Sequence, residues 1–183
     1  EPLEGTLIRS LLVQDRENDA DWSIVQSIQN GDPVFGDRDA VYTTLPAQLA
    51  GAEYIRTACD SKNSSSDLAV FTAGAHITVY TALDSRGTAL PAWLKDWTAT
   101  GLTAETDKGV QFVLYSRQAA KGEQITLGSN GQSSGCVGYA VFAVGASRLA
   151  GDVNGDGAFS IADVVSLQKW LRGGDPLSDW QAG

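Results

Sequence analysis

Short apolar or alternating runs, separated by polar turn-forming clusters, repeat from Thr6 to about Ser147. This pattern is typical of an all-β sandwich or barrel, and helical periodicity is almost absent from it. The expected strands are 6–13, 22–29, 40–45, 53–59, 67–72, 76–83, 110–117 and 139–146. They predict an all-β fold, a two-sheet, jelly-roll-like β-sandwich.

Alternation assigns the two faces of the clearest strand, 110–117. Phe112 and Leu114 point to the core, whereas Tyr115 and Arg117 point to the opposite face. Tyr80 takes a similar place on strand 76–83. These tyrosines either form a sugar-facing surface or cover a second, smaller core as half-buried sheet residues.

A different pattern begins after Leu149, where the chain reads GDVNGDGAFSIAD. This spacing matches an EF-hand-type calcium loop, in which oxygen ligands occupy fixed positions around a glycine turn. The expected calcium ligands, at loop positions 1, 3, 5, 7, 9 and 12, are Asp152, Asn154, Asp156, the carbonyl of Ala158, Ser160 and Asp163. An amphipathic helix over 162–172 should follow.

The stretch GDVNGDGAFSIADVVSLQKWLRG resembles the first repeat of a dockerin, the calcium-dependent docking module of cellulosomal enzymes. We therefore expect a β-sandwich domain over 1–148 and a truncated dockerin, one calcium loop and helix, over 149–183. The resemblance implies calcium as cofactor and cohesin as partner. Cohesin contacts would come from Ile161-Ala162 and Gln168-Lys169.

Composition narrows the function classes. The formal net charge is −9, and no segment clusters Lys and Arg with aromatic residues, so nucleic acid is not an expected partner. No apolar run approaches the ~20 residues of a membrane span. The absence of Met, including at the start, favours a module excised from a longer chain. Cys59 and Cys136 lack zinc-type spacing and are either a disulfide or two buried thiols.

Catalysis is not expected. His76 is the single histidine, and the chain lacks HExxH and phosphate-binding glycine motifs. A carboxylate pair among the acidic residues of 15–21 remains open, although such runs are usually solvated surface.

The stretch PAWLKDW places Trp93 and Trp97 four residues apart after a proline, on one face of a short helical turn. Indoles stack against pyranose rings, so the pair could form a binding platform. For Trp93 an anchoring role for the loop is favoured, and for Trp97 both roles stay open.

Three stretches, GDPVFGDRDAVYTTLPAQLAGAEYIRTACDSK, VYTALDSRGTALPAWLKDWTATG and QFVLYSRQAAKGEQITLGSNG, resemble carbohydrate-binding modules attached to pectinases and other plant cell-wall enzymes. The resemblance implies that basic side chains meet uronate carboxylates. The matching positions are Arg38, Arg56, Lys62, Arg86 and Arg117. Residues 1–148 carry 17 acidic and 11 basic side chains, a net of −6, which repels a polyuronate at long range.

A competing interpretation makes the arginines structural. It pairs Arg38 with Asp37 or Asp39, Arg56 with Asp60, and Arg86 with Asp84. The structural role is favoured for Arg38 and Arg56, and the two roles stay balanced for the other basic residues. The expected ligand-binding residues are therefore Lys62, Arg86, Arg117, Tyr115 and Trp97.

Together these patterns predict a non-catalytic module of a secreted, extracellular, cellulosome-associated enzyme. Its expected ligand is a plant cell-wall polysaccharide, pectin (homogalacturonan) first. The alternatives are a neutral β-glucan or xylan as ligand, a small polysaccharide lyase or esterase, and a purely structural module.

Overall fold

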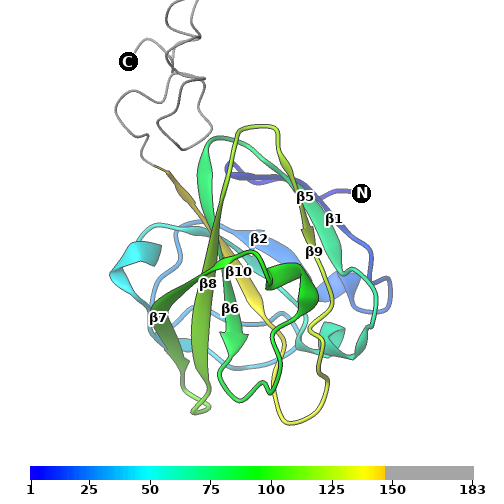
Figure 1. Cartoon of the computed structure of the whole chain (residues 1–183), viewed down its shortest axis with the longest axis vertical. Helices are drawn as coiled ribbons and strands as arrows, with labels where there is room; N and C mark the ends of the chain where they lie inside the picture. The colour runs from blue at the N-terminus through cyan, green and yellow to red at the C-terminus, as the bar shows by residue number, and fades with distance from the viewer. Residues whose placement is uncertain (147–183) are drawn as a thin grey trace, which may run out of the picture. The chain divides into compact units, whose positions relative to one another are not determined.

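The computed structural model describes residues 1–146, which form a β-sandwich with almost no helix (Figure 1). The strands are β1 (Ile8–Val13), β2 (Ser23–Val25), β3 (Tyr42–Thr44), β4 (Glu53–Arg56), β5 (Ala69–Ala73), β6 (Ile77–Asp84), β7 (Thr98–Thr106), β8 (Gln111–Ala119), β9 (Gln124–Leu127) and β10 (Ala140–Gly145). Four short 3-10 helices connect them, η1 (Asp19–Asp21), η2 (Ala47–Leu49), η3 (Cys59–Asn63) and η4 (Ala92–Leu94).

The strands form two antiparallel sheets. The smaller sheet has the order β1-β5-β9, and the larger one has the order β2-β4-β10-β6-β8-β7-β3. The longest register joins β6 to β8, from Ile77 opposite Ala119 to Asp84 opposite Phe112. The sequence prediction of a two-sheet β-sandwich is confirmed.

The first core fills the space between the two sheets. Ile8, Phe71 and Ile125 come from the small sheet, and Val79 and Val141 come from the large one, all at 0–1 % exposure. Strand alternation explains this set, because Val79 lies two residues from Ile77 and both face the same side.

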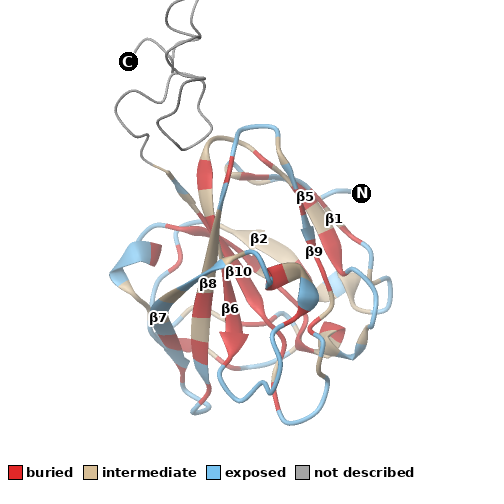
Figure 2. Cartoon of the chain, viewed as in Figure 1, coloured by how far each residue is buried: buried red, intermediate tan, exposed pale blue. Residues whose placement is uncertain are grey.

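The second core lies inside the large sheet, which curls around it. Tyr42 on the edge strand β3 contacts Phe142 on β10, with ring centroids 5.9 Å apart, although three strands separate β10 from β3 in the sheet. It also meets Tyr54 on β4 edge-on, at 6.4 Å. Buried residues therefore alternate along β10 between the two cores, and Figure 2 shows this strand as largely buried.

The segment between β2 and β3 bridges the two ends of the curled sheet. Pro33 pairs with Val41, and Phe35 pairs with Thr57 just after β4. The backbone of Gly36 runs so close to Asp21 that a Cβ would lie 1.9 Å from its carbonyl oxygen, which only glycine permits.

Each of the eight expected strand regions overlaps an observed strand, which is usually shorter than expected. β7 and β9 were not predicted. β7 reads TATGLTAET and buries only Ala104 and Thr106, so it lacks a clear apolar alternation. The calcium loop, its helix and the dockerin resemblance lie outside the described residues.

Cys59 and Cys136 are both buried and free, so they are two thiols and do not form a disulfide. No helix in residues 1–146 combines the length and apolar character needed to cross a membrane.

Candidate functional site

A groove opens where β6 ends and the chain turns toward η4. We call it the Tyr115 groove, and it has a volume of about 200 Å³. Its lining residues are Leu83, Asp84, Ser85, Gly87, Thr88, Ala89, Leu90, Val113 and Tyr115. Val113 and Tyr115 face it from β8, opposite Leu83 and Thr81 of β6.

The Tyr115 groove combines an aromatic ring from β8 with a loop that carries both apolar and hydroxyl side chains. Tyr115 is half-buried, and Leu90 is the one large hydrophobic residue of the described chain that is markedly exposed, at 44 %. Ser85 and Thr88 are exposed in the same loop as Leu90. An aromatic ring beside hydroxyl groups suits the apolar face and polar edge of a sugar ring.

The loop of the groove is built on a tight turn at Asp84. The backbone N–H of Gly87 donates to the Asp84 carbonyl at 3.0 Å, and the N–H of Arg86 donates to Asp84 Oδ1 at 3.0 Å. Aspartate is favoured here because its side chain can accept from its own turn. Farther along the loop, Thr88 donates its N–H and its hydroxyl to Gln132 Oε1.

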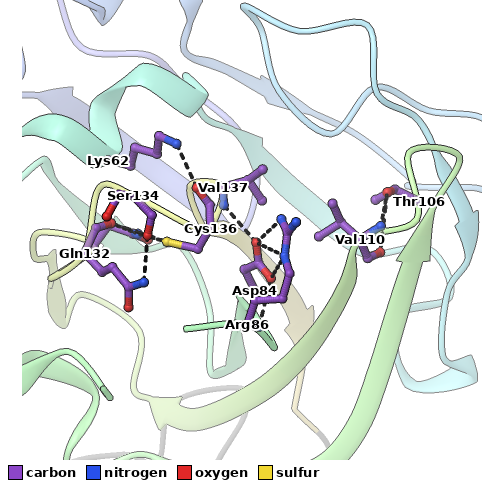
Figure 3. Close-up of polar contacts among 10 residues, drawn as sticks. Lys62, Asp84, Arg86, Thr106, Val110, Gln132, Ser134, Cys136 and Val137 are labelled. Atoms are coloured by element: carbon purple, nitrogen blue, oxygen red, sulfur yellow. Dashed lines mark hydrogen bonds and ion pairs between the residues drawn. The ribbon is translucent and has the colours of Figure 1, made fainter. Parts of the chain in front are cut away.

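The Asp84 carboxylate is buried and bonded on several sides. Arg86 Nη2 binds Oδ2 at 2.6 Å, Arg86 Nε binds Oδ1 at 2.9 Å, and the N–H of Val137 donates to Oδ2 at 2.8 Å (Figure 3). Burial raises the pKa of Asp84, but the hydrogen bonds from Arg86 and Val137 outweigh it and leave the pKa below its usual value. Arg86 is thus paired with Asp84, as the structural interpretation expected, and its side chain is not among those that line the Tyr115 groove.

Arg117 lies on the same face of β8 as Tyr115, two residues along, opposite Val79. Its guanidinium pairs with the Glu123 carboxylate. That carboxylate also accepts the N–H of Ala120 at 3.0 Å. Arg117 therefore holds the turn between β8 and β9 while remaining partly exposed.

Trp93 lies in η4 and Trp97 follows it, and the two rings are in contact, as expected from their spacing. Trp93 and Trp97 contact edge to face, with centroids 5.6 Å apart. Trp93 Nε1 donates to the Ser129 carbonyl at 2.9 Å, and its ring packs 5.2 Å from that of Tyr139. Trp93 thus anchors the loop. Trp97 is half-buried and directly precedes β7, two residues before the Ala99 that pairs with Tyr115.

Lys62 does not line the Tyr115 groove. Its Nζ donates to the Cys136 carbonyl at 2.7 Å, which ties η3 to the loop before β10 (Figure 3). Of the five residues expected to bind ligand, only Tyr115 lines the groove. Arg117 and Trp97 lie near Tyr115, on β8 and just before β7. Arg86 is in the groove loop but bonded to Asp84, and Lys62 lies apart.

One expected ion pair is wrong. Asp60 pairs with Arg38, at 2.5 Å, and not with Arg56, whose Nε is buried without a hydrogen-bond partner. Arg38 also pairs with Asp37 at 3.1 Å, as the structural interpretation expected. Its two terminal nitrogens are thus both taken by neighbouring carboxylates.

Tyr80 packs against the second core and not into the Tyr115 groove. The structure therefore separates the two strand tyrosines, giving Tyr80 the core-covering role. Sequence reasoning missed Leu90 and Thr88, because they stand in a loop with no periodic pattern. Within residues 1–146, no three His, Cys, Asp or Glu side chains gather so as to hold a metal ion.

Comparison with known proteins gives structural relatives only. No family profile matches the chain, and no curated protein matches it by sequence. A solved β-glucuronidase from glycoside hydrolase family 2 is similar, with a TM-score of 0.68 and 26% identity over 80% of this chain. A GH138 enzyme targeting pectin rhamnogalacturonan II shares the fold, with a TM-score of 0.50 and 12% identity over 78% of the chain. This chain spans only 15% and 17% of those two proteins, both carbohydrate-active enzymes.

Proposed function

We propose that the β-sandwich binds a plant cell-wall polysaccharide without catalysis, through the Tyr115 groove. The observation that carries the proposal is the half-buried ring of Tyr115 beside a loop that holds exposed Leu90 and the hydroxyl groups of Ser85 and Thr88. The similarity to one segment of a carbohydrate-active enzyme at 26% identity supports it.

The groove is small for a complete ligand. A pocket that encloses a drug-sized molecule has ~300–1,000 Å³, and the Tyr115 groove has about 200 Å³. We infer that it takes about one sugar ring of a chain that continues along the surface, which suits a polysaccharide better than a free small molecule.

Pectin is the first ligand in this proposal, with Arg86 and Arg117 meeting uronate carboxylates. Each guanidinium already has a carboxylate partner, so the uronate would share the cation with Asp84 or Glu123. Arg86 is 54 % exposed and can offer its outer edge. Because these cations are already paired, a neutral β-glucan or xylan stacked on Tyr115 is the second candidate.

The wider setting is proposed from the sequence alone. We place the module in a secreted, cellulosome-associated enzyme, with residues 149–183 binding calcium and, in a complete dockerin, cohesin. A small lyase or esterase remains the enzymatic rival, and turnover of polysaccharide substrates would identify it.

Affinity electrophoresis of the full chain in gels containing pectins, xylans, glucans and mannans tests the proposal. We expect retardation by at least one polysaccharide, its loss in Tyr115→Ala, and its retention in Tyr115→Phe, which keeps the ring. Thr126→Ala, an exposed position on β9 of the other sheet, is the control. Absence of retardation by every polysaccharide would refute the binding function.

A further inference from the structure

A second cavity lies at the end of the curled sheet, beside the turn that joins β7 to β8. We call it the Phe35–Phe112 cavity, and its volume is about 250 Å³. Nothing in the polysaccharide proposal uses it, and its chemistry differs from that of the Tyr115 groove.

The interior of the Phe35–Phe112 cavity is apolar. Phe35 and Phe112 meet edge to face with centroids 6.4 Å apart, and Ala40, Val110 and Val137 complete the surface around them. Cys59 adds a thiol whose burial raises its pKa, so this group is neutral. Such a surface favours an apolar ring as ligand.

Sugars do not suit this interior, because their hydroxyl groups would lack partners. Thr106 is the hydroxyl-bearing residue of the lining, and it is engaged with Val110: its Oγ1 accepts the Val110 N–H at 3.2 Å (Figure 3). Burying an unpaired hydroxyl costs free energy, so a ligand here should be polar at one end only.

The mouth of the cavity carries a charged side chain that suits the polar end of such a ligand. Lys108 lies on it, 48 % exposed, with Asp39 and Asp107 each 3.5 Å from its Nζ. Asp39 is 90 % exposed, and pairs this long and this exposed contribute little. Arg38, also at the mouth, is held by Asp37 and Asp60, so its charge is already balanced and Lys108 is the cation left to the ligand.

We propose that the Phe35–Phe112 cavity binds a small aromatic monocarboxylate, with its ring among Phe35, Val110 and Phe112 and its carboxylate at Lys108. A single carboxylate fits better than a phosphate, because the four surrounding aspartates repel a dianion more strongly than a monoanion. The site is separate from the polysaccharide proposal and stands if that proposal fails.

Titration of the isotopically labelled full chain with benzoate, followed by NMR, tests this site. We expect saturable shifts of the Val110 and Val137 methyl groups. Acetate, which lacks the ring, and benzamide, which lacks the charge, should bind at least about tenfold more weakly, which corresponds to ~1.4 kcal/mol. Shifts confined to other residues, no saturation, or equal binding of benzamide would overturn the proposal.

Two variants separate the ring from the charge. Ala40→Leu fills the cavity and should abolish benzoate binding while the thermal midpoint is kept. Lys108→Gln should weaken benzoate roughly tenfold and leave benzamide unchanged, with Lys95→Gln, an exposed lysine after η4, as the matched control. An unchanged affinity for benzoate in a folded Ala40→Leu variant would also overturn the proposal. If that variant does not fold, the methyl shifts of the unmodified chain with benzoate test the proposal instead.

Discussion

The carboxylate of Asp84 accepts a hydrogen bond from the backbone N–H of Val137 at 2.8 Å, across 53 residues of sequence. Asp84 lines the Tyr115 groove, and Val137 lines the Phe35–Phe112 cavity. One buried carboxylate therefore joins the walls of both candidate sites. It also holds Arg86, so the position of this cation depends on the same group.

Replacing Asp84 by Asn should destabilise the sandwich. The amide keeps one acceptor oxygen but turns an NH₂ group toward donors from Arg86 and Val137. We expect a loss of about 1–3 kcal/mol in the free energy of unfolding, measured in urea. The control is Glu4→Gln, which removes the charge that pairs with exposed Arg9 and should change stability much less. Equal effects of the two substitutions would contradict the buried role of Asp84.

The same carboxylate should make stability depend on pH in the acid range. Its pKa in the folded chain lies below the ordinary value of 3.8, so the folded state stabilises the ionised form. That stability is complete above the ordinary pKa and disappears as pH falls through the lowered one. The difference between the unmodified chain and Asp84→Asn should therefore shrink below about pH 4 in urea titrations. A difference that stays constant down to pH 2 would contradict this.

Glu53 offers a second test of a buried carboxylate. It is 2 % exposed, and its oxygens accept the backbone N–H groups of Thr6, Leu7 and Ile8 at 2.9–3.2 Å. It thereby holds the start of β1 against β4. Glu53→Gln should cost roughly 2–4 kcal/mol of unfolding free energy, because its NH₂ would face these donors.

Amide hydrogen exchange of β1 locates that effect. We expect faster exchange of Ile8 and its neighbours in Glu53→Gln, whereas Glu105→Gln, an exposed position on β7, should leave it unchanged. Slow exchange of β1 in a folded Glu53→Gln variant would show that the carboxylate is not the anchor.

The sequence predicted the sandwich because most strands bury one face, as in β8, where Phe112 and Leu114 alternate with Val113 and Tyr115. It missed β7 because most of this strand is exposed, and its threonine and glycine residues show no alternation of apolar and polar positions. Arg56 was assigned to Asp60 by nearness in sequence, whereas Arg38 reaches Asp60 from 22 residues away. Tyr115 was found from its strand, but Leu90 belongs to a loop that only the folded chain places beside it.

Calcium binding by the C-terminal loop is a prediction from sequence spacing. Titration calorimetry of the full chain should give one calcium site, because six oxygen ligands follow the EF-hand order. Asp152→Ala and Asp156→Ala should each remove the heat, whereas Asp96→Ala, an exposed acid next to η4, should not. Heat that persists in both loop variants would contradict the assignment. Absence of any calcium heat from the full chain would contradict it as well.

Ionic strength and esterification distinguish an acidic ligand from a neutral one. If uronates bind near Arg86, affinity for sparsely esterified pectin should fall as salt rises, since screening shortens from ~30 Å at 0.01 M to ~8 Å at 0.15 M. Highly methyl-esterified pectin lacks most of the charge and should bind more weakly. Arg86→Gln should reduce affinity about tenfold, as expected for a lost charged hydrogen bond.

Arg9→Gln is the matched control for that substitution, because Arg9 is 55 % exposed, is paired with Glu4, and lies on the other sheet. Its affinity should equal that of the unmodified chain, and the thermal midpoints of both variants should be compared, since Arg86 also bonds Asp84. Equal retardation by both pectins, with Tyr115→Ala still abolishing binding, would exclude the uronate contact. It would assign the Tyr115 groove to a neutral glycan, whose affinity rests on stacking and is therefore nearly independent of salt.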